Sequence, residues 1–316
     1  MPLHPALQHL IETKLAHTRA PQWALPIADV RQAFRALWTF AMTGAPLPVD
    51  RVEDVAIPSG DTRIRVRLYT PDRGQRDPVM VYLHGGGYVK GGVDESDTFC
   101  RNLSRLARHL VVSVEYRLAP EHPFPAALDD AIAATAWACT HAAELGAARG
   151  PVVICGESAG GNLAAVSCLA ARSDPRLAIR HQVLLQPVVD FALTSASIAM
   201  KPTECLVPRD DLAWYYRTYV GGEHDMKDPR VSPLYAPDLS GLPPALIIAA
   251  EYDTLRDEAK AYADRLAAAG VPTRYTCYPG MIHGFLQMGG LVPDARAALE
   301  EIASAVSDSQ RSIDSR

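Results

Sequence analysis

Hydrophobic and polar positions along the chain predict strands that alternate with helices. Short apolar runs stand at Val79–Leu83, Leu110–Glu115, Val152–Cys155, Val183–Leu185, Ala245–Ala249 and Thr273–Tyr278. Segments of helical length separate several of these runs, namely Glu95–Arg108, Pro125–Glu144, Ala159–Arg172 and Arg256–Ala269, and Pro293–Val306 follows the last run. Strands alternating with helices favour a mostly parallel sheet that is flanked by helices. The predicted fold class is therefore α/β.

Two stretches fall outside this alternation. Residues 1–45 carry apolar side chains at a helical period, as at Leu7, Leu10 and Ile11. Residues 187–233 contain aromatic-rich helical pieces without a strand signal. An insertion of this kind in an α/β sheet is a candidate lid over a site.

Composition narrows the classes of protein that the chain can belong to. Of 316 residues, 48% are hydrophobic, which is too many for a disordered chain. The net charge of −5 argues against nucleic acid as a partner, because phosphate binding needs an excess of Lys and Arg. No run of 18 apolar residues and no secretory signal is visible, so we expect a cytoplasmic protein that does not span a membrane. The six cysteines lack metal-ligand spacing, so reduced, mostly buried thiols and no metal site are expected.

The motif Gly156-Glu-Ser-Ala-Gly160 is the sharpest chemical feature of the sequence. It follows the apolar run Val152–Cys155 and precedes a helical segment, which is the strand–turn–helix context of a nucleophilic serine. The turn must be sharp to lift the Ser158 hydroxyl clear of the sheet, and the two glycines leave room for neighbouring backbone. Ser158 is therefore the candidate nucleophile.

A run of glycines, His84-Gly-Gly-Gly87, directly follows the strand Val79–Leu83. Glycines let backbone N–H groups approach a ligand closely, and an oxyanion needs such preorganised donors. The candidate oxyanion hole consists of the N–H groups of Gly85, Gly86 and Ala159. His84 is expected to orient this loop, not to act as a base.

A nucleophilic serine needs a base, and the base needs an orienting acid, in the chain order Ser, acid, His. Asp253 follows the strand Ala245–Ala249, and Glu251 is the alternative acid. Asp257 and Glu258 are expected in the first turn of the next helix. His283 lies in a glycine-flanked loop after the strand Thr273–Tyr278, whereas His181 and His224 precede the acid. Asp253 and His283 therefore complete the predicted triad.

Together these motifs resemble the hormone-sensitive-lipase-like carboxylesterases, the bacterial family IV, of the α/β-hydrolase fold. The resemblance covers nearly the whole chain and includes Glu115-Tyr-Arg-Leu-Ala-Pro-Glu-His-Pro-Phe-Pro-Ala126 and His283-Gly-Phe285. It implies an esterase with the triad and oxyanion hole named above. It also implies a helical cap made of residues 1–45 and 187–233 on a catalytic domain of residues 46–186 and 234–316. Family members are often dimers through the sheet edge near Thr273–Tyr278.

The expected reaction is hydrolysis of a small, short- to medium-chain carboxylic ester through an acyl-enzyme, without a cofactor. One alternative is an amide or arylacetamide deacetylase with the same triad. Another is a non-catalytic ligand receptor on this scaffold, which the presence of His283 disfavours. The candidate pocket residues are apolar side chains of the cap and neighbours of the motifs, namely Phe34, Trp38, Leu206, Trp214, Tyr215, Tyr88, Met281 and Phe285.

Overall fold

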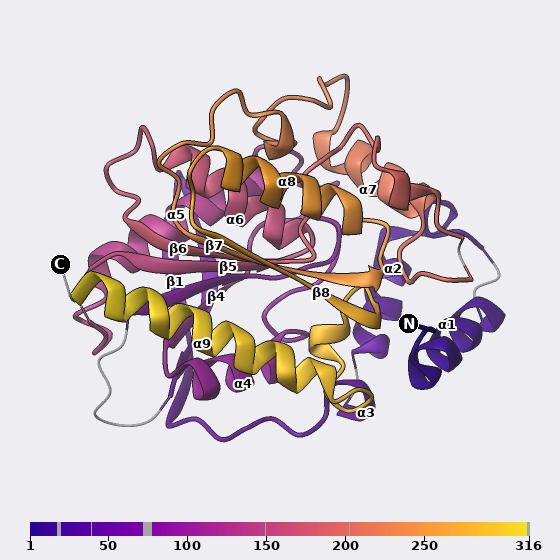
Figure 1. The fold of residues 1–316 in the computed structure, drawn as a ribbon, viewed down its shortest axis with the longest axis horizontal. Helices are drawn as coiled ribbons and strands as arrows, with labels where there is room; N and C mark the ends of the chain where they lie inside the picture. The colour runs from indigo at the N-terminus through magenta and orange to yellow at the C-terminus, as the bar shows by residue number, and fades with distance from the viewer. Residues whose placement is uncertain (18–19, 39, 72–77, 149, 202, 315–316) are drawn as a thin grey trace.

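A mostly parallel sheet forms the centre of the protein. A computed structural model describes residues 1–17, 20–38, 40–71, 78–148, 150–201 and 203–314. In these residues eight strands form one sheet in the order β1-β2-β4-β3-β5-β6-β7-β8, and Figure 1 shows this sheet between helices. They are β1 (Arg51–Ser59), β2 (Thr62–Thr70), β3 (Val79–Leu83), β4 (Leu110–Val114), β5 (Val152–Glu157), β6 (Ile179–Leu185), β7 (Ala245–Tyr252) and β8 (Thr273–Ile282). Only the β1–β2 and β2–β4 pairs among them are antiparallel, which confirms the predicted sheet.

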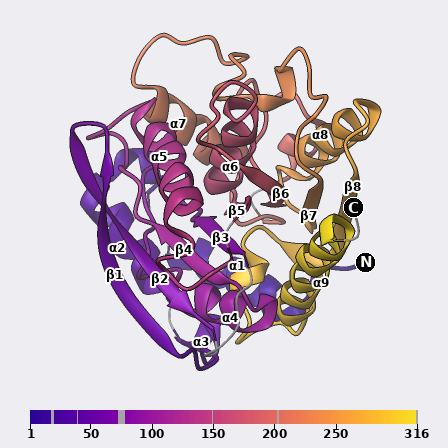
Figure 2. The same ribbon diagram turned by 90° about the vertical axis from the view of Figure 1, so that its left-hand side faces the viewer.

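Two hydrophobic cores cover the two faces of the sheet. In β3, Val79, Val81 and Leu83 enter one core, and Met80 and Tyr82 enter the other. Three helices pack on the first face, namely α5 (Ala126–His141), α6 (Ala159–Ala170) and α8 (Arg256–Ala268), while α4 (Asp97–Ala107) and α9 (Asp294–Asp314) pack on the second (Figure 2). Burial on both faces explains why the central strands are continuous apolar runs.

Strand β1 was not predicted from the sequence. It is an edge strand, and of its nine residues only Ile57 and Ser59 are buried. A strand with so little buried surface carries almost no alternating hydrophobic signal. Its pairing with β2 through the turn at Gly60 and Asp61 fixes its place instead.

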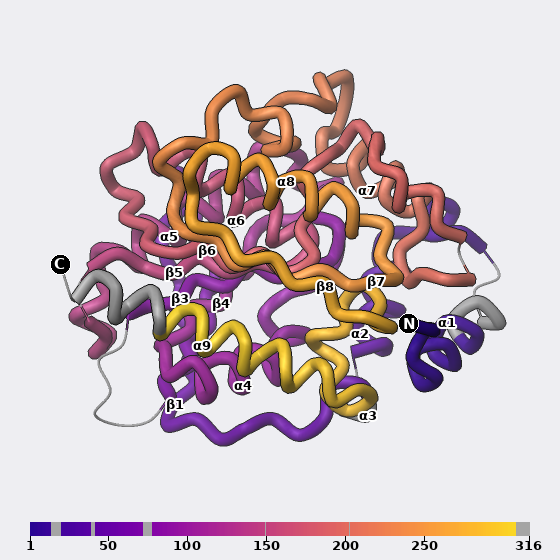
Figure 3. Tube along the Cα trace, in the orientation of Figure 1, coloured from indigo at the N-terminus to yellow at the C-terminus, as the bar shows by residue number. Residues whose placement is uncertain are grey.

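The N-terminal helices and the inserted segment lie at the same end of the sheet. In the first part of the chain are α1 (Pro5–His17), the short turn η1 (Gln22–Ala24), α2 (Ile27–Leu37) and α3 (Phe40–Thr43). In the insertion are η2 (Ala196–Ala199) and α7 (Arg209–Val220), and η3 (Pro233–Tyr235) follows. In Figure 3, α1, α2 and α7 lie at the right-hand end of the molecule, the end at which β7 and β8 finish. The amino group of Met1 pairs with Glu251 at the end of β7, 2.9 Å away.

Two further observations concern the whole described chain. No helix in the described ranges is both long enough and apolar enough to cross a membrane. The cysteine thiols lie mostly inside the protein, because Cys100, Cys155, Cys168 and Cys205 are buried, and Cys139 and Cys277 are partly exposed. Strand β8 forms a sheet edge, and the expected dimer through it stays a prediction.

Candidate active site

Ser158 occupies a strained turn between β5 and the start of α6. Its backbone has φ 56° and ψ −116°, a conformation that costs a non-glycine residue about 1–3 kcal/mol. The turn is held by hydrogen bonds from the Ser158 N–H to the Leu185 carbonyl (2.9 Å) and from the Val188 N–H to the Ser158 carbonyl (3.1 Å). The strain directs the side chain, which is 8% exposed, into a cavity.

Glycines allow the backbone to pack tightly around this turn. A Cβ atom at Gly160 would overlap the Leu83 carbonyl oxygen, which belongs to the end of β3. A Cβ atom at Gly156 would overlap the Gly160 carbonyl oxygen. The predicted reason for both glycines is therefore correct, because α6 starts directly against the chain that leads into the glycine-rich loop.

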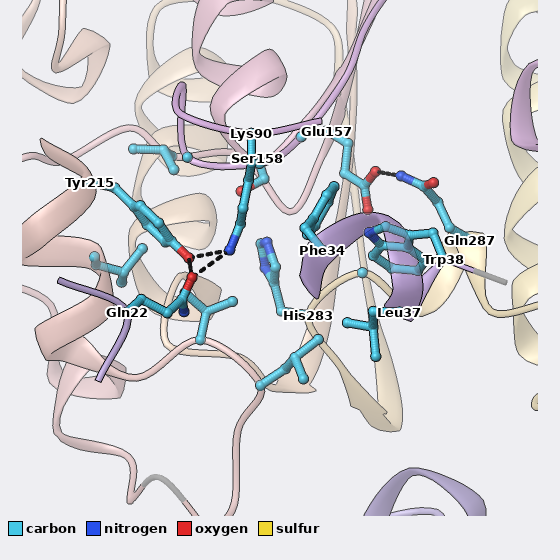
Figure 4. A pocket seen from close by; sticks show the side chains of 18 of the residues that line it. Gln22, Phe34, Leu37, Trp38, Lys90, Glu157, Ser158, Tyr215, His283 and Gln287 are labelled. Atoms are coloured by element: carbon cyan, nitrogen blue, oxygen red, sulfur yellow. Dashed lines mark hydrogen bonds between the residues drawn. The ribbon is translucent and has the colours of Figure 1, made fainter. Parts of the chain in front are cut away.

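Asp253 and His283 lie together at the carboxyl ends of β7 and β8. The Nδ1 atom of His283 is 2.8 Å from Oδ2 of Asp253, and Oδ1 of Asp253 accepts a bond from the Leu255 N–H at 3.0 Å. A carboxylate accepts hydrogen bonds, so Nδ1 carries the hydrogen and Nε2 keeps its lone pair for a proton. His283 and Ser158 line the same cavity (Figure 4).

The surroundings of His283 change its proton affinity. Burial lowers the pKa of His283, but the negative charge of Asp253 and the hydrogen bond to it act in the opposite direction. The charge of Glu157 adds to the effect of Asp253, so the pKa of His283 lies above its usual value. An imidazole with a raised pKa is a stronger base, as proton removal from a hydroxyl requires.

The other acids near Asp253 have structural partners. Glu251 accepts a hydrogen bond from the Gly280 N–H (2.7 Å) in addition to its ion pair with Met1. Asp257 and Glu258 lie in the first turn of α8, as expected. Glu258 is buried and accepts a bond from the Val189 N–H (2.8 Å), so it holds the start of the inserted segment.

The glycine-rich loop lies beside Ser158. Gly85 and Gly86 line the same cavity as Ser158, and a Cβ atom at Gly85 would be 3.5 Å from the Ser158 Cβ. Gly86 has φ +121°, and a Cβ there would overlap the Lys90 carbonyl oxygen, so only glycine fits. Ala159 is the first residue of α6, where helix N–H groups have no partner within the helix.

His84 braces this loop, in agreement with the expectation. Its ring stacks on Tyr116 with centroids 4.1 Å apart, and its Nδ1 donates to the Gly85 carbonyl at 2.7 Å. The Tyr116 hydroxyl in turn donates to the His84 carbonyl at 2.7 Å. Burial lowers the pKa of His84, which favours the neutral ring.

The cavity has a volume of about 80 Å³ and a largely apolar wall. Of the candidate pocket residues, four line it, namely Phe34, Trp38, Leu206 and Tyr215. The other four lie elsewhere in the structure. Tyr88 is fully buried and stacks on Tyr219, with centroids 3.8 Å apart, while Met281 and Phe285 belong to the core under β8. Trp214 packs partly buried against the other core.

Polar residues also line the cavity, and the sequence did not single them out as a group. They are Gln22, Lys90, Glu157 and Gln287. Glu157 is buried and accepts hydrogen bonds from the Tyr82 hydroxyl (3.3 Å) and from the Gln287 amide. Burial raises the pKa of Glu157, whereas the charge of His283 and these hydrogen bonds lower it. In the described residues no group of three or more metal-ligating side chains is arranged to hold a metal ion.

Comparison with known proteins gives a consistent result. Residues 80–287 match the model of a protein family that is described by its α/β-hydrolase fold. The chain is 42% identical over 272 residues to the carboxylic ester hydrolase LipN of Mycobacterium tuberculosis. The aligned region covers 84% of this chain and 72% of LipN. It is 36% identical over 293 residues to an ethyl acetate hydrolase of Pseudomonas putida, and the aligned region covers 90% of this chain and 91% of that hydrolase.

A solved structure agrees with these sequence matches. The hyperthermophilic esterase of the archaeon Pyrobaculum calidifontis superposes with a TM-score of 0.90 at 39% identity, over 98% of this chain and 99% of the esterase. The match extends across the sheet, the flanking helices and the segments at the ends of the strands. The chain therefore belongs to the hormone-sensitive-lipase-like carboxylic ester hydrolases of the α/β-hydrolase family.

Proposed function

We propose that the protein hydrolyses carboxylic esters with Ser158 as nucleophile, His283 as base and Asp253 as the acid that orients the base. The observation that carries this proposal is the 2.8 Å hydrogen bond between Asp253 and His283, made at a cavity that His283 shares with Ser158. Three groups of the required types from three separate loops thereby meet at one end of the sheet.

In the first half of the reaction Ser158 Oγ bonds to the ester carbonyl carbon, and its proton passes to Nε2 of His283. The negative charge that develops on the carbonyl oxygen is stabilised by the N–H groups of Gly85, Gly86 and Ala159. The bond from carbon to the alkoxy oxygen then breaks. That oxygen takes the proton from His283 and leaves as the alcohol, so an acyl-enzyme remains.

In the second half water takes the place of Ser158. His283 removes a proton from the water as its oxygen bonds to the acyl carbon, and the oxyanion hole binds the charge again. The bond to Ser158 Oγ breaks, and the serine recovers its proton from His283. Asp253 stays ionised throughout and stabilises the imidazolium that forms twice in each cycle.

We assign residues 1–45 and 187–233 to a cap, and residues 46–186 and 234–316 to the catalytic domain. Support comes from the cavity, whose wall includes Phe34 of the first segment and Leu206 and Tyr215 of the second. The two segments also bond to each other, because the Gln22 amide donates to Asp211 at 2.6 Å. A cap of this kind excludes water and strengthens the electrostatic effects inside the site.

The substrate is a small neutral ester with a short to medium acyl chain. The apolar wall and the volume of about 80 Å³ favour a chain of a few carbons over a long-chain lipid. A series of para-nitrophenyl esters from acetate to dodecanoate tests this assignment. The highest kcat/KM is expected among the shorter chains, and a maximum at dodecanoate would contradict it.

The role of Ser158 is tested by Ser158→Ala, which removes the nucleophile but leaves the buried turn in place. Hydrolysis of para-nitrophenyl butanoate should fall by about 10⁴-fold or more, with the circular dichroism spectrum unchanged. Ser173→Ala is the matched control, because Ser173 is exposed and outside the cavity. Retained activity in the Ser158 variant would exclude this nucleophile.

A further inference from the structure

A second cavity adjoins the catalytic cavity. This outer chamber has a volume of about 380 Å³ and lies between Ile11 and residues 21–37 on one side and residues 205–211 on the other, with Lys90 in its wall. Trp23 and Leu25, which also line it, are large apolar residues that remain 46% and 37% exposed. An apolar hollow that adjoins a site for small esters is suited to a hydrocarbon chain.

The two cavities share five residues, which form the wall between them. They are Gln22, Phe34, Leu37, Lys90 and Leu206. Three of these are apolar, so the barrier to an apolar chain depends on the other two. Gln22 comes from the N-terminal segment and Lys90 from the loop that follows Gly86.

Lys90 makes this wall polar and ties it together. Its Nζ donates to Gln22 Oε1 at 2.7 Å and to the Tyr215 hydroxyl at 2.5 Å (Figure 4). Its ammonium group also lies 5.1 Å from the Phe34 ring centroid and 4.8 Å from that of Tyr215. The Tyr215 hydroxyl donates to Gln22 (2.8 Å), which donates onward to Asp211 (2.6 Å).

A hydrocarbon chain that extends from the catalytic cavity into the outer chamber must pass this bridge. It must either displace the ammonium group from its acceptors or lie against a partly buried charge, and both cost free energy. We propose that Lys90 is a specificity-determining residue, which closes the passage and thereby limits the chain length of the ester. The inference rests on the proposed ester hydrolysis and names the residue that sets its substrate range.

Lys90→Ala tests the inference, because it removes the side chain from the passage. Two series are measured, one with increasing acyl chains (para-nitrophenyl esters) and one with increasing alcohol chains (alkyl acetates). In at least one series the kcat/KM of the decyl compound relative to the butyl compound should rise about tenfold or more, since each buried methylene contributes roughly fourfold. An unchanged ratio in both series would overturn the inference.

Matched variants separate the passage from general effects. Lys260→Ala makes the same substitution on the exposed surface of α8, where Lys260 pairs with Asp264, and should leave both ratios unchanged. Gln22→Ala removes an acceptor of Lys90 without touching the lysine, and should raise the ratio in the same series. If Lys90→Ala does not fold, an unchanged ratio in Gln22→Ala overturns the inference.

Filling the outer chamber tests where the longer chain goes. Ala33 lines the outer chamber but not the catalytic cavity, and it is exposed on α2. Adding Ala33→Phe to Lys90→Ala should cancel the gain for decyl compounds and leave butyl compounds unaffected; a gain that persists would overturn the inference. If the Lys90→Ala variant hydrolyses butanoate normally and both ratios are unchanged, only the inferred passage is overturned. If the wild-type protein shows no esterase activity, the proposed function is overturned as well.

Discussion

At the scale of single residues, the site depends on one carboxylate whose two oxygens both accept hydrogen bonds. Asp253 is 1% exposed, and its two oxygens bind His283 Nδ1 and the Leu255 N–H. A carboxylate fixed in this way holds the imidazole in one tautomer and one orientation. It also raises the pKa of His283 against the effect of burial, which lowers it.

The Asp253→Asn variant should change both the rate and its pH dependence. In the proposed mechanism neutral His283 is the base, so kcat/KM of the wild type should rise with pH through the raised pKa of His283, above about 6.5. Without the charge of Asp253, burial dominates and lowers the pKa of His283, so the rising limb of the pH profile should move to lower pH. The kcat should fall about 10⁴-fold. A pH profile from 5 to 9 measures both, with Asp264→Asn on the exposed face of α8 as control. An unmoved limb would contradict the pairing.

Residues at the ends of strands could be predicted, whereas the polar wall residues Gln22 and Lys90 could not. Ser158, Asp253 and His283 each follow an apolar run, and parallel strands bring such positions to one edge. Tyr88 is next to the glycine run, but its φ of 65° belongs to a chain reversal, and its ring stacks on Tyr219. Lys90 binds groups 68 and 125 positions away in the chain, which no local pattern indicates.

At the scale of elements, the active site requires that β3, β5 and α6 approach closely. Gly160 lies in the first turn of α6, where the space for a side chain is filled by the carbonyl oxygens of Leu83 and His84. Neither oxygen can move without shifting the glycine-rich loop that carries Gly85 and Gly86. The position of the helix and the geometry of the proposed oxyanion hole are therefore coupled.

Gly160→Ala should separate these elements. The added methyl group forces the backbone apart, so we expect a loss of unfolding free energy of about 1–3 kcal/mol, as for overpacked cores. The kcat/KM should fall as well, because the oxyanion donors lose their alignment with Ser158. Gly222→Ala is the matched control, since a Cβ at Gly222 meets no atom within 4 Å. Urea unfolding and ester kinetics measure the effect, and equal results for both variants would contradict the coupling.

At the scale of the whole molecule, the strands that could be predicted from the sequence are those that are buried. The central strands were found from sequence because they are buried on both faces, while β1, with two buried residues of nine, was not. The segments around Gln22 and Asp211 lie 189 positions apart and meet over the site. Each segment interrupts the alternation of strands and helices in the sequence. Their contact with each other depends on the tertiary structure, so no local pattern predicts it.

The central claim is that one serine of this chain is activated, and covalent labelling tests it most directly. An organophosphate such as diethyl para-nitrophenyl phosphate reacts with an activated serine and cannot be released by the usual hydrolysis. We predict one phosphoryl group per chain by intact mass, located on Ser158 by peptide mapping, with ester hydrolysis lost in proportion to labelling. Full labelling at another residue, or sustained ester hydrolysis by a chain labelled at Ser158, would contradict the assignment.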